Sequence, residues 1–127
     1  MFVLGLQGSP RAKGNTNTLL SAFLDEVRKL GGRVVTLDAT KMKVLPCLGC
    51  GTCERKGYCP QDDDMQGAYP LLRKADLTVL ATPIYFYGAT AQMKAFIDRS
   101  QALWSRKYAL GLEDPRRKWR KGFLLAV

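Results

Sequence analysis

Short apolar runs alternate with polar or amphipathic stretches along the chain. The runs at 2–6, 33–37, 77–82 and 122–127 have the length of β-strands. Run 2–6 is almost wholly apolar, as in a parallel strand that is buried on both faces. The stretches between the runs are long enough to carry the crossover connections that parallel strands need. The pattern therefore predicts an α/β fold around a parallel sheet.

The stretch between the first two strands predicts an amphipathic helix. Asn15–Asn17 supply candidate N-cap side chains, and Gly31-Gly32 is a natural stop at the other end. One face of this helix gathers the apolar residues Leu19, Leu20, Phe23, Leu24, Val27 and Leu30. A strand, a helix and a second strand in this order predict a right-handed crossover.

Two further helices are predicted, at about 64–75 and at 90–105. Asp62–Asp64 can cap the first of them, and Pro70 is expected in or near a bend. The second presents a candidate buried face made of Ala91, Met93, Ala95, Phe96, Ile97 and Leu103. We expect segment 106–120 to be irregular and basic. Residues 1–127 then form a single domain.

The remaining segment, 43–64, is too long for a plain connector, and loops of that length usually carry function. It holds every cysteine of the chain, in the spacing C-x2-C-x2-C-x5-C and followed by Pro60: Cys47, Cys50, Cys53 and Cys59. Gly49, Gly51 and Gly57 permit the positive φ angles that a tight wrap requires. Such a run ending in Cys-Pro is typical of iron–sulfur ligation, so we interpret the four thiols as ligands of one cluster.

Three other states of these cysteines compete with the cluster. Disulfides need an oxidising compartment, of which the sequence gives no sign. A structural zinc ion also takes four thiolates, although zinc sites usually divide their ligands into two separated pairs. The tight triple favours the cluster, and zinc or free thiols remain as alternatives.

Composition and charge narrow the function classes. With 46% hydrophobic and 24% charged residues, the chain resembles an ordinary globular protein. We expect a cytoplasmic protein, because no run is long enough to span a membrane and the N-terminus lacks a signal peptide. The net charge is +9, and part of the excess lies in the run 116–121 around Trp119. We favour a solvated or anion-attracting surface over nucleic-acid binding, since no nucleic-acid motif accompanies the run.

The loop after the first strand is a candidate phosphate site. Residues 9–18 are rich in hydroxyl and amide side chains and lead into a helix, whose N-terminus offers backbone N–H groups and a positive dipole end. Neither the Walker order nor G-x-G-x-x-G is present. A simple polar turn therefore remains an alternative.

The loop after the third strand is a candidate ring-binding site. It contains three consecutive aromatic residues, Tyr85, Phe86 and Tyr87, which can wall a flat aromatic ligand. The alternative is a hydrophobic loop that packs on a neighbouring subunit. Both interpretations hold if the site lies at an interface.

Three blocks of the sequence together resemble a known family. GSPRAKGNTNTLL, PCLGCGTCERKGYCPQDDDM and TPIYFYGATAQMKAFIDRS are similar to segments of the iron–sulfur flavoproteins, a branch of the flavodoxin-like NAD(P)H-dependent FMN reductases. The likeness runs in register from residue 1 to about 100. It implies a flavodoxin-like three-layer α/β/α sandwich with a parallel sheet. Because family members continue past the fourth strand, a C-terminal strand and helix are expected to be missing.

The resemblance also implies site residues by position. The FMN phosphate is expected at Ser9, Arg11, Asn15, Thr16, Asn17 and Thr18. The isoalloxazine ring is expected along Pro83, Ile84, Tyr85, Phe86, Tyr87 and Gly88. A [4Fe–4S] cluster is expected on Cys47, Cys50, Cys53 and Cys59.

The function implied by the resemblance is electron transfer, from NAD(P)H or reduced ferredoxin through FMN and the cluster to quinone, oxygen or peroxide. Homodimers or homotetramers are implied as well. The absence of histidine is compatible with chemistry that the flavin carries. One alternative is a cluster-free NAD(P)H-dependent FMN or quinone reductase, whose cysteines are free or bind zinc. Another is a zinc-stabilised module that binds anionic partners through residues 116–121.

Overall fold

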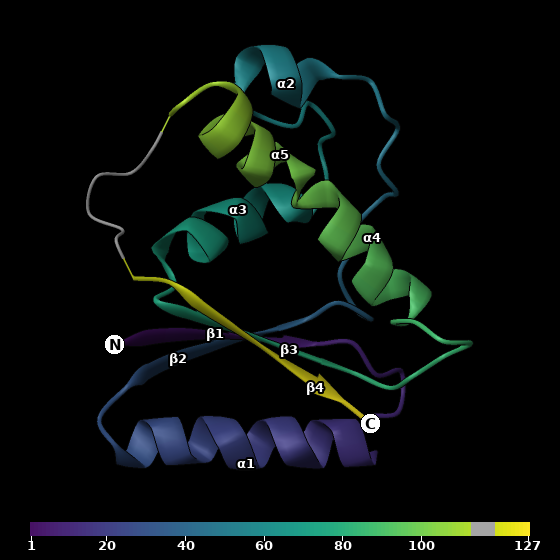
Figure 1. Cartoon of the computed structure of the whole chain (residues 1–127). Helices are drawn as coiled ribbons and strands as arrows, with labels where there is room; N and C mark the ends of the chain where they lie inside the picture. Colours follow the sequence, from purple (N-terminus) through teal and green to yellow (C-terminus); the bar gives the residue numbers. More distant parts are fainter. Residues whose placement is uncertain (113–118) are drawn as a thin grey trace.

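The sheet is parallel throughout, as predicted. The computed structural model describes residues 1–112 and 119–127. Four strands lie in the order β2-β1-β3-β4 (Figure 1). Their bounds are β1 Phe2–Gln7, β2 Arg33–Asp38, β3 Leu77–Thr82 and β4 Lys121–Ala126. This is the beginning of the flavodoxin-like strand order, in which β1 lies between β2 and β3.

The helices form two layers, one on each face of the sheet (Figure 1). One layer is α1, Asn15–Lys29. The opposite layer contains α3 (Met65–Lys74), α4 (Ala91–Arg99) and α5 (Gln101–Trp104), with the short α2 (Thr52–Lys56) beyond them. The step from β1 to β2 and the step back to β3 run in opposite directions along the sheet, so right-handed crossovers place their helices on opposite faces. The three-layer sandwich is confirmed.

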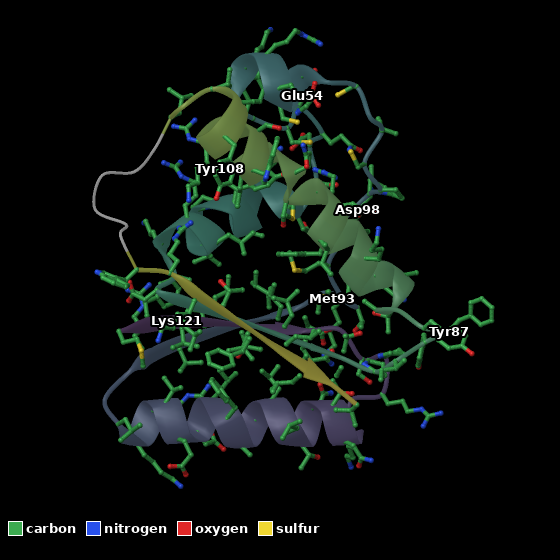
Figure 2. All side chains as sticks on the ribbon, in the orientation of Figure 1. Glu54, Tyr87, Met93, Asp98, Tyr108 and Lys121 are labelled. Carbon is green, nitrogen blue, oxygen red and sulfur yellow. The ribbon has the colours of Figure 1, made fainter. Side chains whose placement is uncertain are left out.

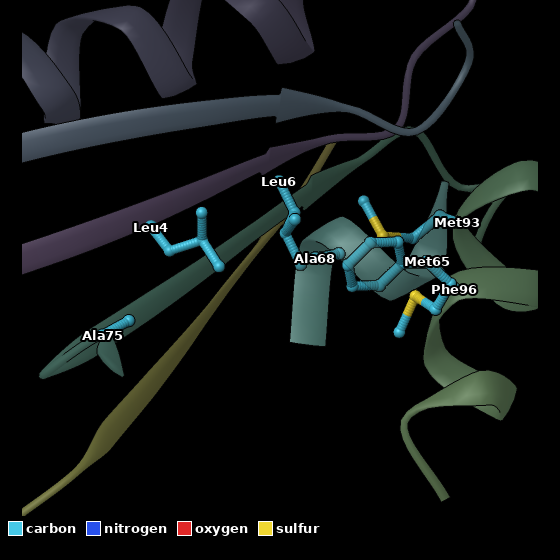
Figure 3. Packing of buried hydrophobic residues seen from close by; sticks show 7 residues of the cluster. All are labelled: Leu4, Leu6, Met65, Ala68, Ala75, Met93 and Phe96. Carbon is cyan, nitrogen blue, oxygen red and sulfur yellow. The ribbon is translucent and has the colours of Figure 1, made fainter. Parts of the chain in front are cut away.

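The core consists of two clusters separated by the sheet. Alternate residues of β1 supply both, because successive side chains of a strand point to opposite faces. The cluster below α3 and α4 contains Leu4, Leu6, Met65, Ala68, Ala75, Met93 and Phe96 (Figure 3). The cluster between the sheet and α1 contains Val3, Leu20, Leu24, Val27, Val79 and Ala81. Every one of these residues is buried.

The two ends of α1 compare differently with the prediction. The C-terminal stop is confirmed: Gly31 has φ +78°, and the N–H groups of Gly31 and Gly32 donate to carbonyls of the last turn. The predicted N-cap is wrong. Gly14 occupies that position, and Asn15–Asn17 already belong to the helix, where no side chain caps the first turn.

The predicted continuous helix 90–105 is broken. It ends as α4 at Arg99, resumes as α5, and continues as a π-helical turn, Ser105–Ala109. The N–H of Ser100 donates to the carbonyls of both Phe96 and Ile97, which marks the bend. Residues 106–109 are therefore helical rather than irregular, while 113–118 lie outside the described residues.

The buried face of α4 differs from the predicted one. The predicted face is correct at Met93 and Phe96, but Ala91 and Ile97 are exposed and Arg99 takes a buried position. In α1, Leu19 and Leu30 are likewise exposed. Periodicity alone located the centre of each apolar face and made it too wide.

The start of α3 agrees with the predicted aspartate cap, and Pro70 lies inside the helix. Asp64 is the N-cap residue but makes no side-chain cap, whereas Asp63 accepts a hydrogen bond from the N–H of Met65 at 3.1 Å.

None of the helices in the described part of the chain has the length and apolar character needed to cross a bilayer.

Candidate functional site

Two of the predicted site loops leave the sheet side by side. β1 pairs with β2 on one side and with β3 on the other, so the strand order reverses at β1. Gln7 at the end of β1 lies opposite Ala81, near the end of β3. In open parallel sheets such a reversal creates a crevice at the carboxyl ends of the strands, where ligands bind. The loops after β1 and β3 both begin there.

Buried hydrogen bonds fix the start of the first loop. The Gln7 side-chain amide donates to the carbonyl of Ser9 at 2.9 Å, and the Ser9 N–H donates back to Gln7 Oε1. Ser9 is only 3% exposed, and its Oγ accepts from the Arg11 N–H at 3.2 Å. The loop therefore turns away from the sheet in a defined direction.

Gly8 packs against β3 and α4 at close range. Its N–H donates to the carbonyl of Ala81 at 2.8 Å, and its carbonyl accepts from Thr90 Oγ1 at 2.7 Å. A Cβ at this position would lie 2.7 Å from Met93 Cε and 3.1 Å from Ala81 O. Thr90 also donates its N–H to Thr82 Oγ1, so the two loops are tied together at the start of α4.

The N-terminus of α1 is suited to an anion. No side chain caps it, and its first turn holds no acidic residue. The Asn17 side-chain amide donates to the carbonyls of Arg11 and Ala12, which folds the loop over this helix end. Thr16 is buried, while Arg11, Asn15 and Thr18 are exposed. Backbone N–H groups and the helix dipole thus suit a phosphate, and the exposed Arg11 lies in the same loop.

The second loop is a tight turn with aromatic residues at its tip. Tyr85 and Gly88 exchange two backbone hydrogen bonds, of 2.9 and 3.0 Å. Between them Phe86 (φ +43°) and Tyr87 (φ +66°) adopt the left-handed conformation that residues other than glycine rarely take. Their side chains are 97% and 96% exposed, and Figure 2 shows Tyr87 at the outer end of the loop.

This turn combines backbone strain with exposed apolar surface. Ile84 is exposed as well, Pro83 is half-buried, and the Phe86 and Tyr87 ring centroids lie 5.8 Å apart. Strain of this kind costs of order 1–3 kcal/mol per residue and is concentrated at ligand sites. The arrangement can wall a flat ligand or a neighbouring protein surface.

The cysteines form a separate site at the other end of α4. All four of them line one pocket of about 80 Å³, and Asp98, Arg99, Gln101 and Ala102 of α4 and α5 line it as well. Figure 2 labels one lining residue from each side, Glu54 of α2 and Asp98 of α4. Gly49, Gly51 and Gly57 all have positive φ angles, as predicted, and the last two flank α2.

Polar groups surround the sulfur atoms. The Gly49 N–H donates to Cys47 Sγ at 3.4 Å, and Ser105 Oγ donates to Cys53 Sγ at 3.8 Å. Cys50 Sγ lies 3.4 Å from Thr52 Oγ1. The Thr52 hydroxyl, together with the Thr52 N–H, lowers the pKa of the Cys50 thiol. At Cys50 the contact favours the thiolate, the form that binds metal.

The four cysteines offer thiol donors around one pocket. All four cysteines are free thiols. Within the described residues, no three or more His, Cys, Asp or Glu side chains converge closely enough to hold one metal ion. A [4Fe–4S] cluster takes one thiolate at each iron, so its cysteines stand around a pocket rather than around a point. Four thiols around one cavity are compatible with that geometry.

A buried ion pair closes the inner side of this pocket. Arg99 binds Asp63 through two hydrogen bonds, of 2.6 and 3.0 Å, and both side chains are 0% exposed. Burial opposes the charge on Asp63, but the hydrogen bonds from Arg99 and from the N–H groups of Leu45 and Met65 together outweigh it, and the pKa of Asp63 is lowered. Sequence reasoning missed both residues. The signal for Arg99 was its spacing of three and six residues from Phe96 and Met93 on the buried face of α4.

Comparison with known proteins decides the family. Residues 1–118 match the family described as NADPH-dependent FMN reductase. The chain belongs to this family. An iron–sulfur flavoprotein of Archaeoglobus fulgidus is 43% identical over 99 residues, which cover 78% of this chain and 45% of the relative. One from Methanosarcina thermophila is 36% identical over 110 residues, covering 87% and 58%. The chain thus spans about half the length of these relatives.

Solved structures support the fold of this FMN reductase family member. A putative quinone reductase from Klebsiella pneumoniae superposes with a TM-score of 0.72 at 20% identity, over 99% of this chain and 58% of the other. An NAD(P)H:quinone oxidoreductase from Methanothermobacter marburgensis gives 0.69 at 16% identity, over 99% and 83%. At these low identities the likeness shows the fold alone, which is flavodoxin-like.

In this family member α4 separates the two sets of predicted site residues. Thr90 at its N-terminus holds the switch-point loops, and Arg99 at its C-terminus lines the cysteine pocket. The nine residues of α4 extend over about 14 Å. The fold therefore brings the two predicted flavin loops together and places the cysteines at a second location.

Proposed function

We propose that the chain is part of a flavin-dependent oxidoreductase that binds FMN at the switch point and a [4Fe–4S] cluster on its four cysteines. The observation that carries the proposal is the pairing of an uncapped helix N-terminus with an aromatic turn at the ends of adjacent strands. Family membership supports the flavin half. The names of the similar proteins and the shared cysteine pocket support the cluster half.

In the proposed flavin site the residues of the first loop bind the phosphate. Ser9 and the α1 N-terminus provide fixed hydrogen-bond donors, and the exposed Arg11 provides the countercharge. Pro83, Ile84, Tyr85 and Gly88 line the ring, while Phe86 and Tyr87 cover it or meet a neighbouring subunit. The protein's contribution is to orient the ring and exclude water from it.

In the proposed cluster site Cys47, Cys50, Cys53 and Cys59 each ligate one iron. FMN accepts two electrons and a cluster accepts one, so together they connect two-electron donors to one-electron traffic. The donor is NAD(P)H, another small molecule or ferredoxin, and the acceptors are quinone, oxygen or peroxide. The hydrogen bonds to Cys47 and Cys53 stabilise the bound thiolates.

We further propose a homodimer or homotetramer in the cytoplasm. The exposed aromatic tip at Phe86 and Tyr87 supports an oligomer, because apolar surface of this kind is usually covered by a ligand or a partner. Cysteines that remain free thiols agree with a reducing compartment.

A cluster-free NAD(P)H-dependent FMN or quinone reductase is the second candidate. It is favoured by the lack of a convergent metal group among the residues described. The zinc-stabilised module with an anion-binding run at 116–121 has less support, because zinc needs four convergent thiolates. Half of that run, residues 116–118, lies outside the described residues.

The flavin half is tested by comparing FMN with riboflavin, which lacks the phosphate. We expect fluorescence titration to show FMN binding at least tenfold more tightly to the unmodified chain. Arg11→Ala should narrow this difference, because it removes the countercharge. Arg28→Ala, at the far end of α1, should leave it unchanged. Equal affinity for FMN and riboflavin would contradict the proposed phosphate site at the α1 N-terminus.

A further inference from the structure

Arg99 places a buried positive charge beside the cysteines. Its side chain is 0% exposed. Nη1 donates to Asp63 Oδ2 at 2.6 Å and to the carbonyl of Leu45 at 2.8 Å, and Nη2 donates to Asp63 Oδ1 at 3.0 Å. The guanidinium is thus held in one orientation, at the point where α4 ends against the cysteine loop.

The ion pair is polarised toward the pocket. Arg99 lines the pocket and Asp63 does not. Among the described residues that line it, Arg99 is the only cation, while Glu54 and Asp98 are acidic. Asp98 is paired with Lys94 at 2.6 Å. Of the two charges in the ion pair, the positive one therefore belongs to the residue that lines the pocket of the four cysteines.

One N–H donor of the Arg99 side chain is also left without a hydrogen-bond partner among the described residues. This donor is Nε, which is buried. A buried donor without a partner costs roughly 1–3 kcal/mol, and more when it is charged. Burial works against the charge of Arg99, but Asp63, Tyr69 and Cys59 together outweigh it and raise the pKa of the guanidinium. The donor is thus permanently charged and needs an acceptor.

Four thiolates in one pocket would in turn require positive charge or hydrogen-bond donors nearby. Each carries a negative charge, and a buried charge is tolerated only when it is paired or hydrogen-bonded. Net charge and hydrogen bonds to the sulfurs are two of the levers that set the potential of an iron–sulfur cluster.

We propose that Arg99 is the charge-compensating residue of the cysteine site, and that its guanidinium raises the reduction potential of the cluster held there. The inference rests on the proposed cluster. Reduction adds one electron and one negative charge to the site and breaks no bond. A fixed cation at the wall of the pocket stabilises the reduced state more than the oxidised one, so its removal lowers the potential.

The test compares two variants that both break the ion pair. Asp63→Asn leaves Arg99 charged, and its amide oxygen can still accept a hydrogen bond. Asp63→Asn combined with Arg99→Gln removes the cation as well. Iron and sulfide per chain are measured first, and the cluster potential is then followed by a dye-mediated redox titration with dithionite as the reductant. The flavin potential in the same samples is the internal control.

We expect Asp63→Asn to have the higher cluster potential and the double variant the lower. The reduction equilibrium should differ by about tenfold, which is about 59 mV for a one-electron couple. The flavin potential should stay unchanged. Equal cluster potentials in the two variants would overturn the role of Arg99. An unmodified chain without iron, even after reconstitution with iron and sulfide, would instead overturn the proposed cluster and this inference with it.

A second pair of substitutions covers the case in which the double variant does not fold. Asp63→Leu with Arg99→Met replaces the buried ion pair by apolar groups, an exchange that is often neutral or stabilising. This variant should fold, bind iron and show a cluster potential below that of the unmodified chain. A potential equal to that of the unmodified chain would count against Arg99.

Discussion

The first loop and the cysteine loop are built in opposite ways. The first loop begins inside the core, where Ser9 is 3% exposed and Gly8 bonds to both β3 and α4. The cysteine loop lies outside it: α2 has no buried residue, and Leu48 is 74% exposed. The sheet therefore shapes one site before any ligand arrives, while the other depends on glycine turns, one ion pair and whatever the thiols bind.

Because of this difference, substitutions in the two sites are expected to have different effects. A change in the first loop is expected to disturb the packing of the fold and the proposed flavin site together. A change at a cysteine disturbs the cysteine loop alone, because few core contacts hold that loop. α4 is the element that both sites share, and each end of it serves one of them.

The largest expected effect comes from Cys50→Ser. This substitution removes one of four ligands from a site without other anchors, so we expect iron and the brown absorbance to be lost completely. FMN should still bind, because the switch point does not use the cysteine loop. Iron, sulfide and FMN per chain are the measurements.

Leu48→Ser is the matched control, since it puts the same side chain at an exposed, non-ligating position of the same loop. It should retain iron. Full iron content in Cys50→Ser would show that this cysteine is not a ligand. Loss of FMN together with iron would show that the two sites are not independent.

Asp63→Asn should give the next largest effect. Breaking one side of a buried ion pair costs about 3 kcal/mol, so we expect a loss of that order in the free energy of unfolding at pH 7. The pKa of Asp63 is lowered in the fold from an unfolded value of about 3.9. The stabilisation is therefore complete above about pH 4 and is lost as the pH falls through the folded pKa.

Urea unfolding of Asp63→Asn and the unmodified chain from pH 7 to pH 3 measures this difference. It should shrink at the acid end, where a protonated Asp63 resembles asparagine. A difference that stays constant down to pH 3 would mean that the carboxylate charge does not contribute.

Gly8→Ala tests the packing of the first loop. The new Cβ would meet Met93 and the Ala81 carbonyl within 3.1 Å. We expect a destabilisation of about 1–3 kcal/mol and weaker FMN binding, with no change in iron content. Denaturant unfolding and flavin titration measure the two effects.

Gly67→Ala is the control for Gly8→Ala. Gly67 lies in α3, and nothing would lie within 4 Å of an added Cβ. This substitution should stabilise the chain by about 0.5–1 kcal/mol. If both variants have the same stability, Gly8 is not closely packed.

The smallest effect is expected at the aromatic turn. Replacing Phe86 with Asn and Tyr87 with Gly supplies the residues that this left-handed turn prefers, so the ligand-free chain should gain about 1 kcal/mol. Riboflavin should bind several-fold more weakly, because the ring loses its aromatic wall. Tyr58→Asn, an exposed tyrosine outside the switch point, serves as the control. A variant that is more stable and binds riboflavin normally would assign the turn to a protein interface.

The sequence predicted what local pattern determines. Four short apolar runs became the four strands, and Gly31 ended α1 as expected. Gly49, Gly51 and Gly57 turned as predicted, because positive φ leaves few other choices of residue. The resemblance of three motifs placed the chain in the FMN reductase family, which the family match confirms. The ligands predicted at each site remain predictions.

The sequence-based predictions failed where contacts between distant parts of the chain determine the structure. The bend at Ser100 depends on how α4 and α5 meet the cysteine loop, so periodicity could not reveal it. Asp63 and Arg99 are 36 residues apart in the sequence, and a charged residue on an apolar face gives no indication of its partner. The role of Thr90 in holding Gly8 likewise required the sheet, because 82 residues separate the two.

The central claim is that one chain holds two separate redox sites. The most direct measurement is a visible spectrum of protein purified without oxygen, with FMN, iron and sulfide counted per chain. The account predicts flavin bands on a broad absorbance, with about one FMN and, as [4Fe–4S] requires, about four irons per chain. A flavin spectrum without iron would contradict it and leave a cluster-free reductase, and iron without flavin would remove the switch-point site instead.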